Sequence, residues 1–119
     1  MKSKQYLVIG LGRFGASVAK TLSEMDQEVL AVDSDQEHVD AIAPYITQAI
    51  QMDVTDESLL AGLAVKHFDA AIVSIGTDMR ASVLVCLMLK EQGVPYLVAK
   101  ANDDLHAKVL RKIGVDRVI

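Results

Sequence analysis

Three glycines follow the first apolar segment of the chain at a spacing that strongly limits its fold. They lie in Gly10-Leu11-Gly12-Arg13-Phe14-Gly15, directly after the apolar run Tyr6-Leu7-Val8-Ile9. In such a motif the first glycine permits a tight strand-to-helix turn, the second lets the backbone approach a pyrophosphate, and the third lets the helix lie close to the sheet. The helix N-terminus then offers free N–H groups and a positive dipole end to phosphates. The alternative is a glycine-rich structural turn that binds no ligand.

The rest of the chain alternates short apolar runs with longer amphipathic ones, as a strand–helix repeat does. We expect strands near Gln5–Ile9, Val29–Asp33, Thr47–Met52, Ala70–Ser74, Tyr96–Ala99 and Arg117–Ile119. We expect helices near Arg13–Met25, Gln36–Ala43, Glu57–Ala64, Met79–Gln92 and Asp103–Ile113. Strict alternation predicts an α/β fold with right-handed crossovers, namely a Rossmann-type doubly wound parallel sheet of about six strands. The expected strand order is 3-2-1-4-5-6, with helices on both faces.

Capping residues support these helix boundaries. Short polar side chains stand where each later helix begins, and their carboxylate or hydroxyl oxygens can accept the first free N–H groups. The candidates are Asp35, Thr55 or Asp56, Thr77 or Asp78, and Asn102 or Asp103, while Gly93 with Pro95 and Gly114 mark helix ends.

Composition narrows the class of protein further. A chain of 119 residues predicts one domain, and the low aromatic content of 4% means that aliphatic side chains must fill the core. The net charge of −4, with scattered Lys and Arg, argues against nucleic-acid binding. No apolar run approaches the ~20 residues of a membrane helix, and the first one is too short for a signal peptide. The single Cys86 is interpreted as a buried thiol in a reducing compartment.

Two side chains near the glycines suggest what the motif binds. Asp33 ends the second predicted strand, where a carboxylate accepts hydrogen bonds from ribose hydroxyls. Its charge would repel a 2′-phosphate, so NADP is disfavoured. Arg13 begins the first helix, and a guanidinium there can hold phosphate oxygens in a fork. The alternative for Arg13 is an exposed arginine without a ligand.

The loops at the carboxyl ends of later strands should line the same crevice. Asp53 could accept a hydrogen bond from an adenine amino group while Val54 packs on the ring, or Asp53 could cap a helix. Gly76 allows close approach to a ribose or phosphate, or serves as a turn glycine. Lys100 points toward the crevice or into solvent, and His106 reaches a phosphate or ribose or is merely structural. We interpret His38 and His67 as surface residues, and we find neither metal-ligand spacing nor a Ser-His-Asp set.

Four segments together resemble the N-terminal lobe of a KTN/RCK domain. Such domains form the cytosolic regulatory subunits of Ktr- and Trk-type potassium transporters. The resemblance covers the whole chain, residues 1–119. The arginine inside the glycine motif and the final segment distinguish it from a generic dinucleotide fold. The segments are Val8 to Gly15, Leu30-Ala31-Val32-Asp33, Ile72-Val73-Ser74-Ile75-Gly76, and Lys108 to Ile119, which ends Lys-Ile-Gly-Val-Asp-Arg-Val-Ile.

The resemblance implies a regulatory subunit, not an enzyme, that binds ATP, ADP, NAD or NADH in its crevice. Arg13 would reach the terminal phosphates of ATP. The ribose would be surrounded by Asp33, Ser34 and Asp35, and the adenine would contact Asp53 and Val54. The remaining contacts would come from Ile75, Gly76, Thr77, Lys100, Ala101, Asn102 and His106.

The same resemblance implies an assembly. Such subunits form homo-oligomers, which are dimers and typically octameric rings. The rings lie beneath a membrane subunit that translocates potassium. We therefore expect this protein at the cytoplasmic face of the membrane, as a peripheral protein. Family members continue into a second lobe, so we expect this chain to be a truncated part of a longer protein. The segment Met79–Leu89 is apolar nearly all round, which suggests that both the sheet and a partner subunit cover it.

Two other functions remain open from the sequence. The chain could be the cofactor domain of an NAD-dependent oxidoreductase, because the fold alone does not fix function. Against this, no substrate domain and no acid–base pair is evident. It could also be a structural oligomerisation domain whose crevice is empty.

Overall fold

A six-stranded, fully parallel sheet organises the chain, as the alternation predicted. The computed structural model describes residues 3–76 and 78–119. The strand order is β3-β2-β1-β4-β5-β6, so the predicted fold class and order are confirmed. The strands are β1 (Gln5–Ile9), β2 (Glu28–Asp33), β3 (Gln48–Gln51), β4 (Ala70–Val73), β5 (Leu97–Ala99) and β6 (Arg117–Val118).

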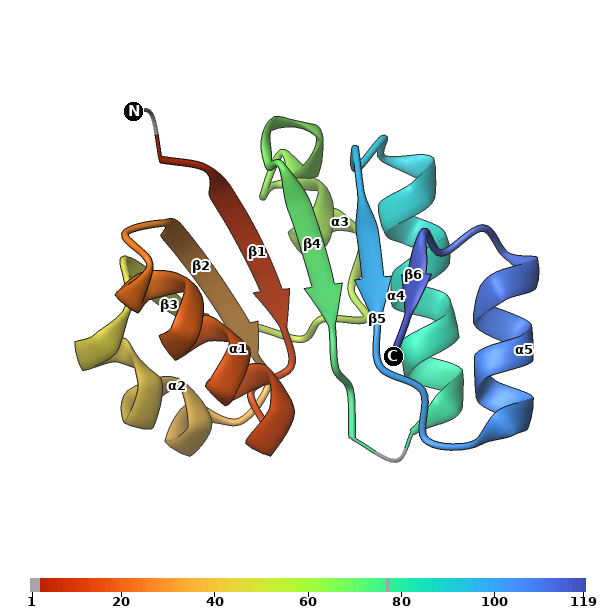
Figure 1. Cartoon of the computed structure of the whole chain (residues 1–119), viewed down its shortest axis with the longest axis horizontal. Helices are drawn as coiled ribbons and strands as arrows, with labels where there is room; N and C mark the ends of the chain where they lie inside the picture. The colour runs from red at the N-terminus through yellow and green to blue at the C-terminus, as the bar shows by residue number, and fades with distance from the viewer. Residues whose placement is uncertain (1–2, 77) are drawn as a thin grey trace.

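The order of the strands reverses beside β1, at the centre of the sheet (Figure 1). Tyr6 of β1 is aligned with Val29 of β2 on one side and with Ala70 of β4 on the other. The chain therefore leaves β1 toward β2 and β3, then crosses back to β4. In open α/β sheets, ligands bind outside the carboxyl ends of the strands at this reversal.

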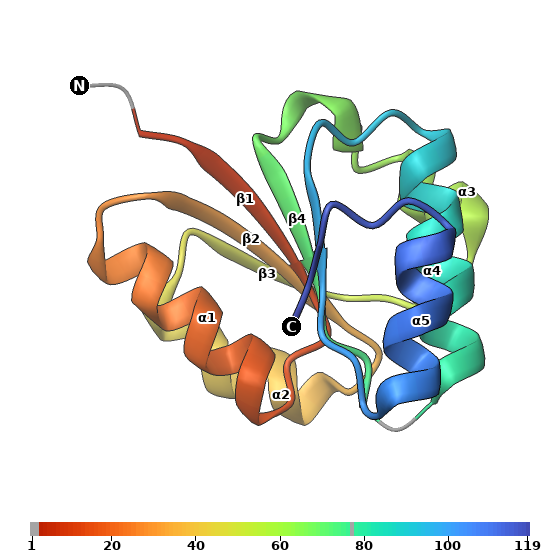
Figure 2. The same cartoon turned by 45° about the vertical axis from the view of Figure 1, so that its right-hand side comes forward.

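Helices cover both faces of the sheet (Figure 2). Helices α1 and α2 lie on one face, and α3, α4 and α5 lie on the other. Their bounds are α1 (Arg13–Glu24), α2 (Gln36–Ile42), α3 (Glu57–Ala61), α4 (Met79–Glu91) and α5 (Asp104–Lys112), with short 3₁₀ turns at Ala43–Tyr45 and Val65–His67.

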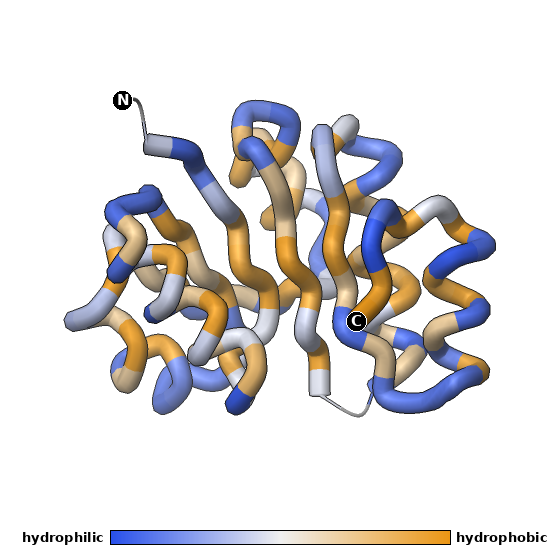
Figure 3. The backbone as a smooth tube through the Cα atoms, viewed as in Figure 1, coloured by the Kyte–Doolittle hydropathy of each residue, from blue (hydrophilic) through white to orange (hydrophobic). Residues whose placement is uncertain are grey.

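Each face of the sheet has its own aliphatic core. Val8, Ala31 and Ile72 point toward α1 and α2, whereas Leu7, Ile9 and Val73 point toward α3, α4 and α5. Neighbouring residues of one strand face opposite sides because strand side chains alternate. With both faces covered, the inner strands β1, β2, β4 and β5 are apolar along most of their length, as the orange stretches in Figure 3 show.

Aspartates cap four of the five helices. Asp35, Asp56, Asp78 and Asp103 each accept a backbone N–H of the helix that follows, which decides the alternatives left open by the sequence. Thr77, the other candidate for α4, lies outside the described residues.

All five helices end earlier than predicted, α3 by three residues and the others by one. Helix α2 stops at Ile42 and continues as a 3₁₀ turn around Pro44, because proline has no N–H to extend an α-helix. Helix α3 stops at Ala61, before Gly62, and the chain then passes through a left-handed residue, Ala64, with φ 53°. Such a residue cannot continue a right-handed helix.

Helix α4 is not enclosed within the chain. Leu84 and Leu87 lie three residues apart on its outer face, and their exposed fractions are 43% and 39%. An apolar face of this kind is typical of a surface that another protein covers. Among the described residues, no helix combines the length and the apolar character needed to cross a membrane.

The thiol of Cys86 on α4 is buried, and burial raises its pKa to about 12. Because the thiolate is the reactive form, only about one thiol in ten thousand is reactive at pH 8. We expect iodoacetamide to label the folded chain at least a hundred times more slowly than the chain in 6 M urea, with mass spectrometry as the readout. Equal rates would show that α4 does not shield this side chain.

Candidate functional site

The loops that follow β1, β2, β3, β4 and β5 meet at the carboxyl edge of the sheet and enclose two adjoining cavities, each of about 270 Å³. The first, here called the Asp33 cavity, is lined by Gly10, Gly12, Asp33, Ser34, Asp35, His38, Val54, Ser74, Ile75 and Gly76. The second, here called the Arg13 cavity, is lined by Gly12, Arg13, Phe14, Ser74, Ile75, Gly76, Lys100 and Asn102. The shared residues make the two cavities one extended crevice.

Close backbone contacts hold the glycine loop against the strand ends. Gly10 has φ 97°, a conformation that side chains disfavour, and a Cβ there would lie 1.9 Å from the carbonyl oxygen of Ser74. A Cβ on Gly15 would lie 1.8 Å from the carbonyl oxygen of Gly10. By contrast, a Cβ on Gly12 would meet nothing within 4 Å. The fold itself therefore requires Gly10 and Gly15, whereas Gly12 keeps open space in the crevice.

The N-terminus of α1 differs from the other helix starts. Gly12 is its N-cap, no side chain accepts its free N–H groups, and its first turn has no acidic residue. Arg13 follows at once, exposed and lining the Arg13 cavity. The described residues contain no salt bridge that pairs Arg13 with a carboxylate. This end of α1 thus carries uncompensated positive charge and N–H donors, the combination that binds phosphate.

The carboxylate of Asp33 joins the glycine loop to the end of β2. Oδ2 accepts the N–H of Leu11 at 2.6 Å, and Oδ1 accepts the N–H of Asp35 at 2.7 Å. The residue is almost buried at 9% exposure. Asp33 therefore fixes the loop in place as well as facing the cavity where we predicted a ribose.

Lys100 and Asn102 bring the loop after β5 to the Arg13 cavity. The ammonium of Lys100 lies 6.0 Å from the ring centre of Phe14. Asn102 donates its side-chain amide to the carbonyl oxygen of Gly76 at 2.6 Å. This bond ties the loop after β5 to the loop after β4 on one side of the cavity.

His106 does not face either cavity, which differs from the contact expected for it. It is 1% exposed, Nδ1 accepts the backbone N–H of Asn102 at 3.0 Å, and Nε2 lies 3.0 Å from Oγ of Ser82. Because Nδ1 accepts, the proton of the neutral ring is on Nε2 and is donated to Ser82. No ring nitrogen remains for a ligand, so His106 supports the cavity through Asn102.

Asp53 also lies outside the cavity lining, unlike its neighbour Val54. Its Oδ1 accepts both the hydroxyl and the backbone N–H of Thr55, at 2.6 and 2.9 Å. These bonds, the hydroxyl first, hold the pKa of Asp53 below its usual range. Leu11, Gly15 and Ala101 likewise do not line the cavities, and Thr77 is outside the described residues.

Two lining residues were absent from the predicted site. Ser74 follows β4 directly, a position that the rule of carboxyl strand ends indicates for a ligand contact. His38 was interpreted as a surface residue, yet its Nδ1 lies 3.3 Å from Oδ2 of Asp33. The position of His38 in the first turns of α2, just after Asp33, was the sequence signal that could have indicated this contact.

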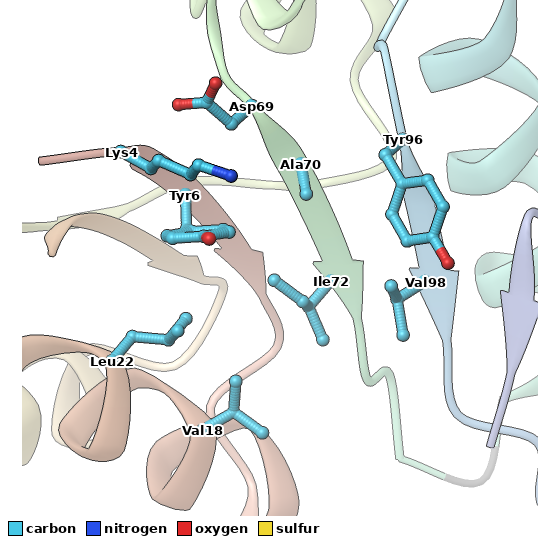
Figure 4. A pocket seen from close by; sticks show the side chains of 9 residues that line it. All are labelled: Lys4, Tyr6, Val18, Leu22, Asp69, Ala70, Ile72, Tyr96 and Val98. Atoms are coloured by element: carbon cyan, nitrogen blue, oxygen red, sulfur yellow. The ribbon is translucent and has the colours of Figure 1, made fainter. Parts of the chain in front are cut away.

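A larger cavity of about 490 Å³ lies between α1 and the side chains of β1, β4 and β5 (Figure 4). Tyr6, Ile72, Tyr96 and Val98 form its floor, and Lys4 and Asp69 stand at its rim. It contains neither a helix N-terminus nor a set of converging donors. The features that suit a phosphate, a free helix N-terminus beside Arg13, are found at the glycine loop and not in this cavity.

Solved structures with this fold are numerous. The chain matches the GsuK channel bound to NAD with a TM-score of 0.84 at 17% identity, covering 99% of this chain and 21% of that chain. It matches GsuK bound to ADP with a TM-score of 0.83 at 17% identity, covering 99% of this chain and 31% of that chain. The Kef C-terminal domain of Shewanella denitrificans in its AMP-bound form gives 0.81 at 19% identity, covering 97% and 69%. At these identities the likeness shows the fold.

Sequence relatives are closer. Ktr system potassium uptake protein A of Bacillus subtilis is 48% identical over 119 residues, which are 100% of this chain and 54% of that protein. Ktr system potassium uptake protein C of the same organism is 47% identical over 116 residues, 98% of this chain and 52% of that protein. The chain thus spans about half the length of these curated relatives. The TrkA-N domain family matches residues 6–119. The chain belongs to the TrkA-N domain family, as its glycine loop, Arg13 and final strand indicated.

Proposed function

We propose that this chain is the nucleotide-sensing domain of a regulatory subunit that gates a potassium uptake transporter. The observation that supports this most directly is the N-terminus of α1, where free N–H groups and Arg13 open onto a crevice that also contains Asp33. Relatives named as Ktr potassium uptake proteins supply the transport context. Structures of the same fold hold NAD, ADP or AMP, which supports an adenine nucleotide as the ligand.

The two cavities suit the two parts of such a ligand. The Asp33 cavity offers carboxylate acceptors for ribose hydroxyls and Val54 as an apolar contact for the base. The Arg13 cavity offers Arg13, Lys100 and the start of α1 to the phosphates. We infer that ATP and ADP bind with their phosphates toward Arg13, and that NAD or NADH is accommodated in the same crevice. The negative charge of Asp33 and Asp35 disfavours the 2′-phosphate of NADP.

We also propose that the chain binds its nucleotide without catalysing a reaction. Ser82 and His106 are the one serine–histidine pair hydrogen-bonded through their side chains among the described residues, but both are buried and away from the cavities. In that pair the histidine donates its proton to the serine, the reverse of what nucleophile activation requires. Binding alone can switch a protein if two ligands prefer different conformations.

The proposed assembly is a homo-oligomer, a dimer or larger, extending to an octameric ring in the full-length protein. The exposed side chains of Leu84 and Leu87 on α4 support the proposal that a second copy of the chain covers that face of the helix. The ring would act on a membrane subunit that translocates potassium, from the cytoplasmic side of the membrane.

Isothermal titration calorimetry of the chain with ATP, ADP, NADH and NADPH tests the proposed ligand class. We expect ATP and ADP to bind, and NADPH to bind at least about tenfold more weakly than NADH, because a phosphate beside a carboxylate costs more than 1 kcal/mol. Binding of NADH alone would instead favour a redox sensor or a dehydrogenase fragment. Binding of none of the four would favour a structural oligomerisation domain.

A further inference from the structure

His38 lines the Asp33 cavity but has no part in the function proposed so far. Its side chain is 46% exposed and belongs to α2. Nδ1 lies 3.3 Å from Oδ2 of Asp33, and Nε2 lies 3.9 Å from Oδ2 of Asp35. The imidazole therefore stands against the carboxylate that faces the proposed ribose position.

The hydrogen bonds of Asp33 leave little acceptor capacity for a ligand. A carboxylate has about four acceptor positions, two on each oxygen. Oδ2 accepts the N–H of Leu11 and faces the His38 ring, so both of its positions are engaged. Oδ1 accepts the N–H of Asp35 and keeps one position. A ribose with free 2′- and 3′-hydroxyls brings two donors, one more than Asp33 can accept in this arrangement.

Only one of the three donors at Asp33 can leave without disturbing the fold. The N–H groups of Leu11 and Asp35 belong to the glycine loop and to the start of α2, where the backbone is fixed. The His38 donor is on a half-exposed side chain, and its bond of 3.3 Å is the longest of the three. Rotation of this side chain would free the second position on Oδ2.

We propose that His38 competes with the ribose for Asp33 and is a displaceable, specificity-determining residue of the nucleoside site. This inference rests on the proposed nucleotide binding. His38 lowers the affinity for ligands that present both ribose hydroxyls, because its ring must leave before both can bind. A ligand with one hydroxyl uses the free position on Oδ1 and avoids the competition.

The test compares ATP with 2′-deoxy-ATP by calorimetry, in the chain and in His38→Ala. The ratio of the two affinities cancels any effect of the substitution on the triphosphate, which both ligands share. We expect His38→Ala to raise ATP affinity about three- to tenfold, the value of one net hydrogen bond, and to change 2′-deoxy-ATP affinity less than twofold. The ratio of ATP affinity to 2′-deoxy-ATP affinity should therefore be higher in His38→Ala than in the unchanged chain.

Two further variants separate the causes. His38→Gln keeps a side-chain N–H donor at the same position of α2, so it should retain part of the competition for Asp33. His67→Ala removes an exposed histidine that does not line the crevice, and it should leave both affinities unchanged.

The possible results distinguish this proposal from the one on which it rests. If the unchanged chain binds neither ligand, the proposed nucleotide binding fails. If it binds both, but His38→Ala weakens ATP or changes the two ligands equally, nucleotide binding stands and the competition by His38 is excluded.

Discussion

Gly15→Ala should strongly destabilise the chain, although alanine is the better helix former. The added methyl group would lie 1.8 Å from the carbonyl oxygen and 2.9 Å from the carbonyl carbon of Gly10, and both are backbone atoms. Helix α1 would have to move away from the glycine loop and the strands beneath it. Overpacking of this kind costs about 3 kcal/mol or more. That is a large part of the 5–15 kcal/mol by which domains are typically stable. Urea unfolding followed by circular dichroism measures the loss.

Gly12→Ala is the matched control, because it adds the same atom to the same loop. A Cβ on Gly12 meets nothing within 4 Å, so we expect the free energy of unfolding to change by less than about 1 kcal/mol. Equal unfolding midpoints for the two variants would contradict the packing of α1 described above.

Arg13→Ala should weaken ATP more than ADP. Arg13 lies at the start of α1, has no salt-bridge partner among the described residues, and lines the cavity assigned to the phosphates. A hydrogen bond between charged groups contributes about 1.5–3 kcal/mol, so loss of the guanidinium should lower ATP affinity about 10- to 100-fold. ADP lacks the terminal phosphate that the side chain would reach, so its affinity should fall less. Calorimetry with both nucleotides gives the comparison.

Arg111→Ala provides the control for loss of a positive charge. Arg111 is exposed in the last turn of α5 and does not line the crevice, so its removal should change ATP affinity less than twofold. If Arg13→Ala weakened ATP and ADP equally, Arg13 would hold the shared phosphates and would not distinguish the two nucleotides. If it changed neither, the phosphates would lie elsewhere.

Local sequence signals predicted most of the fold because the interactions behind them are local. An aspartate caps the helix that begins at the next residue, as Asp35 and Asp103 do. Apolar runs with both faces buried indicate strands of a parallel sheet. The glycine motif also predicted the close approach of Gly15 to the backbone of Gly10, since its spacing reflects how a helix must leave a strand.

Side-chain directions in the site depended on contacts that the sequence pattern did not predict. The His106 ring turns inward to meet Ser82 on another helix as well as the nearby N–H of Asn102. His38 is only five residues from Asp33, yet we interpreted it as a surface residue, and the structure places its ring beside the carboxylate. For Asp53 the sequence offered a nearby hydrogen-bond partner as the alternative to an adenine contact, and in the structure its carboxylate accepts the hydroxyl of Thr55.

By itself the sequence determined the α/β class, the strand order, the region where each helix begins and the position of the glycine loop, because periodicity, capping and turn geometry act over a few residues. Only the tertiary structure decided which side chains share Asp33, which line the crevice and which support it from behind. Those relations arise where five strand ends converge, and no local pattern encodes the competition among donors for one buried carboxylate.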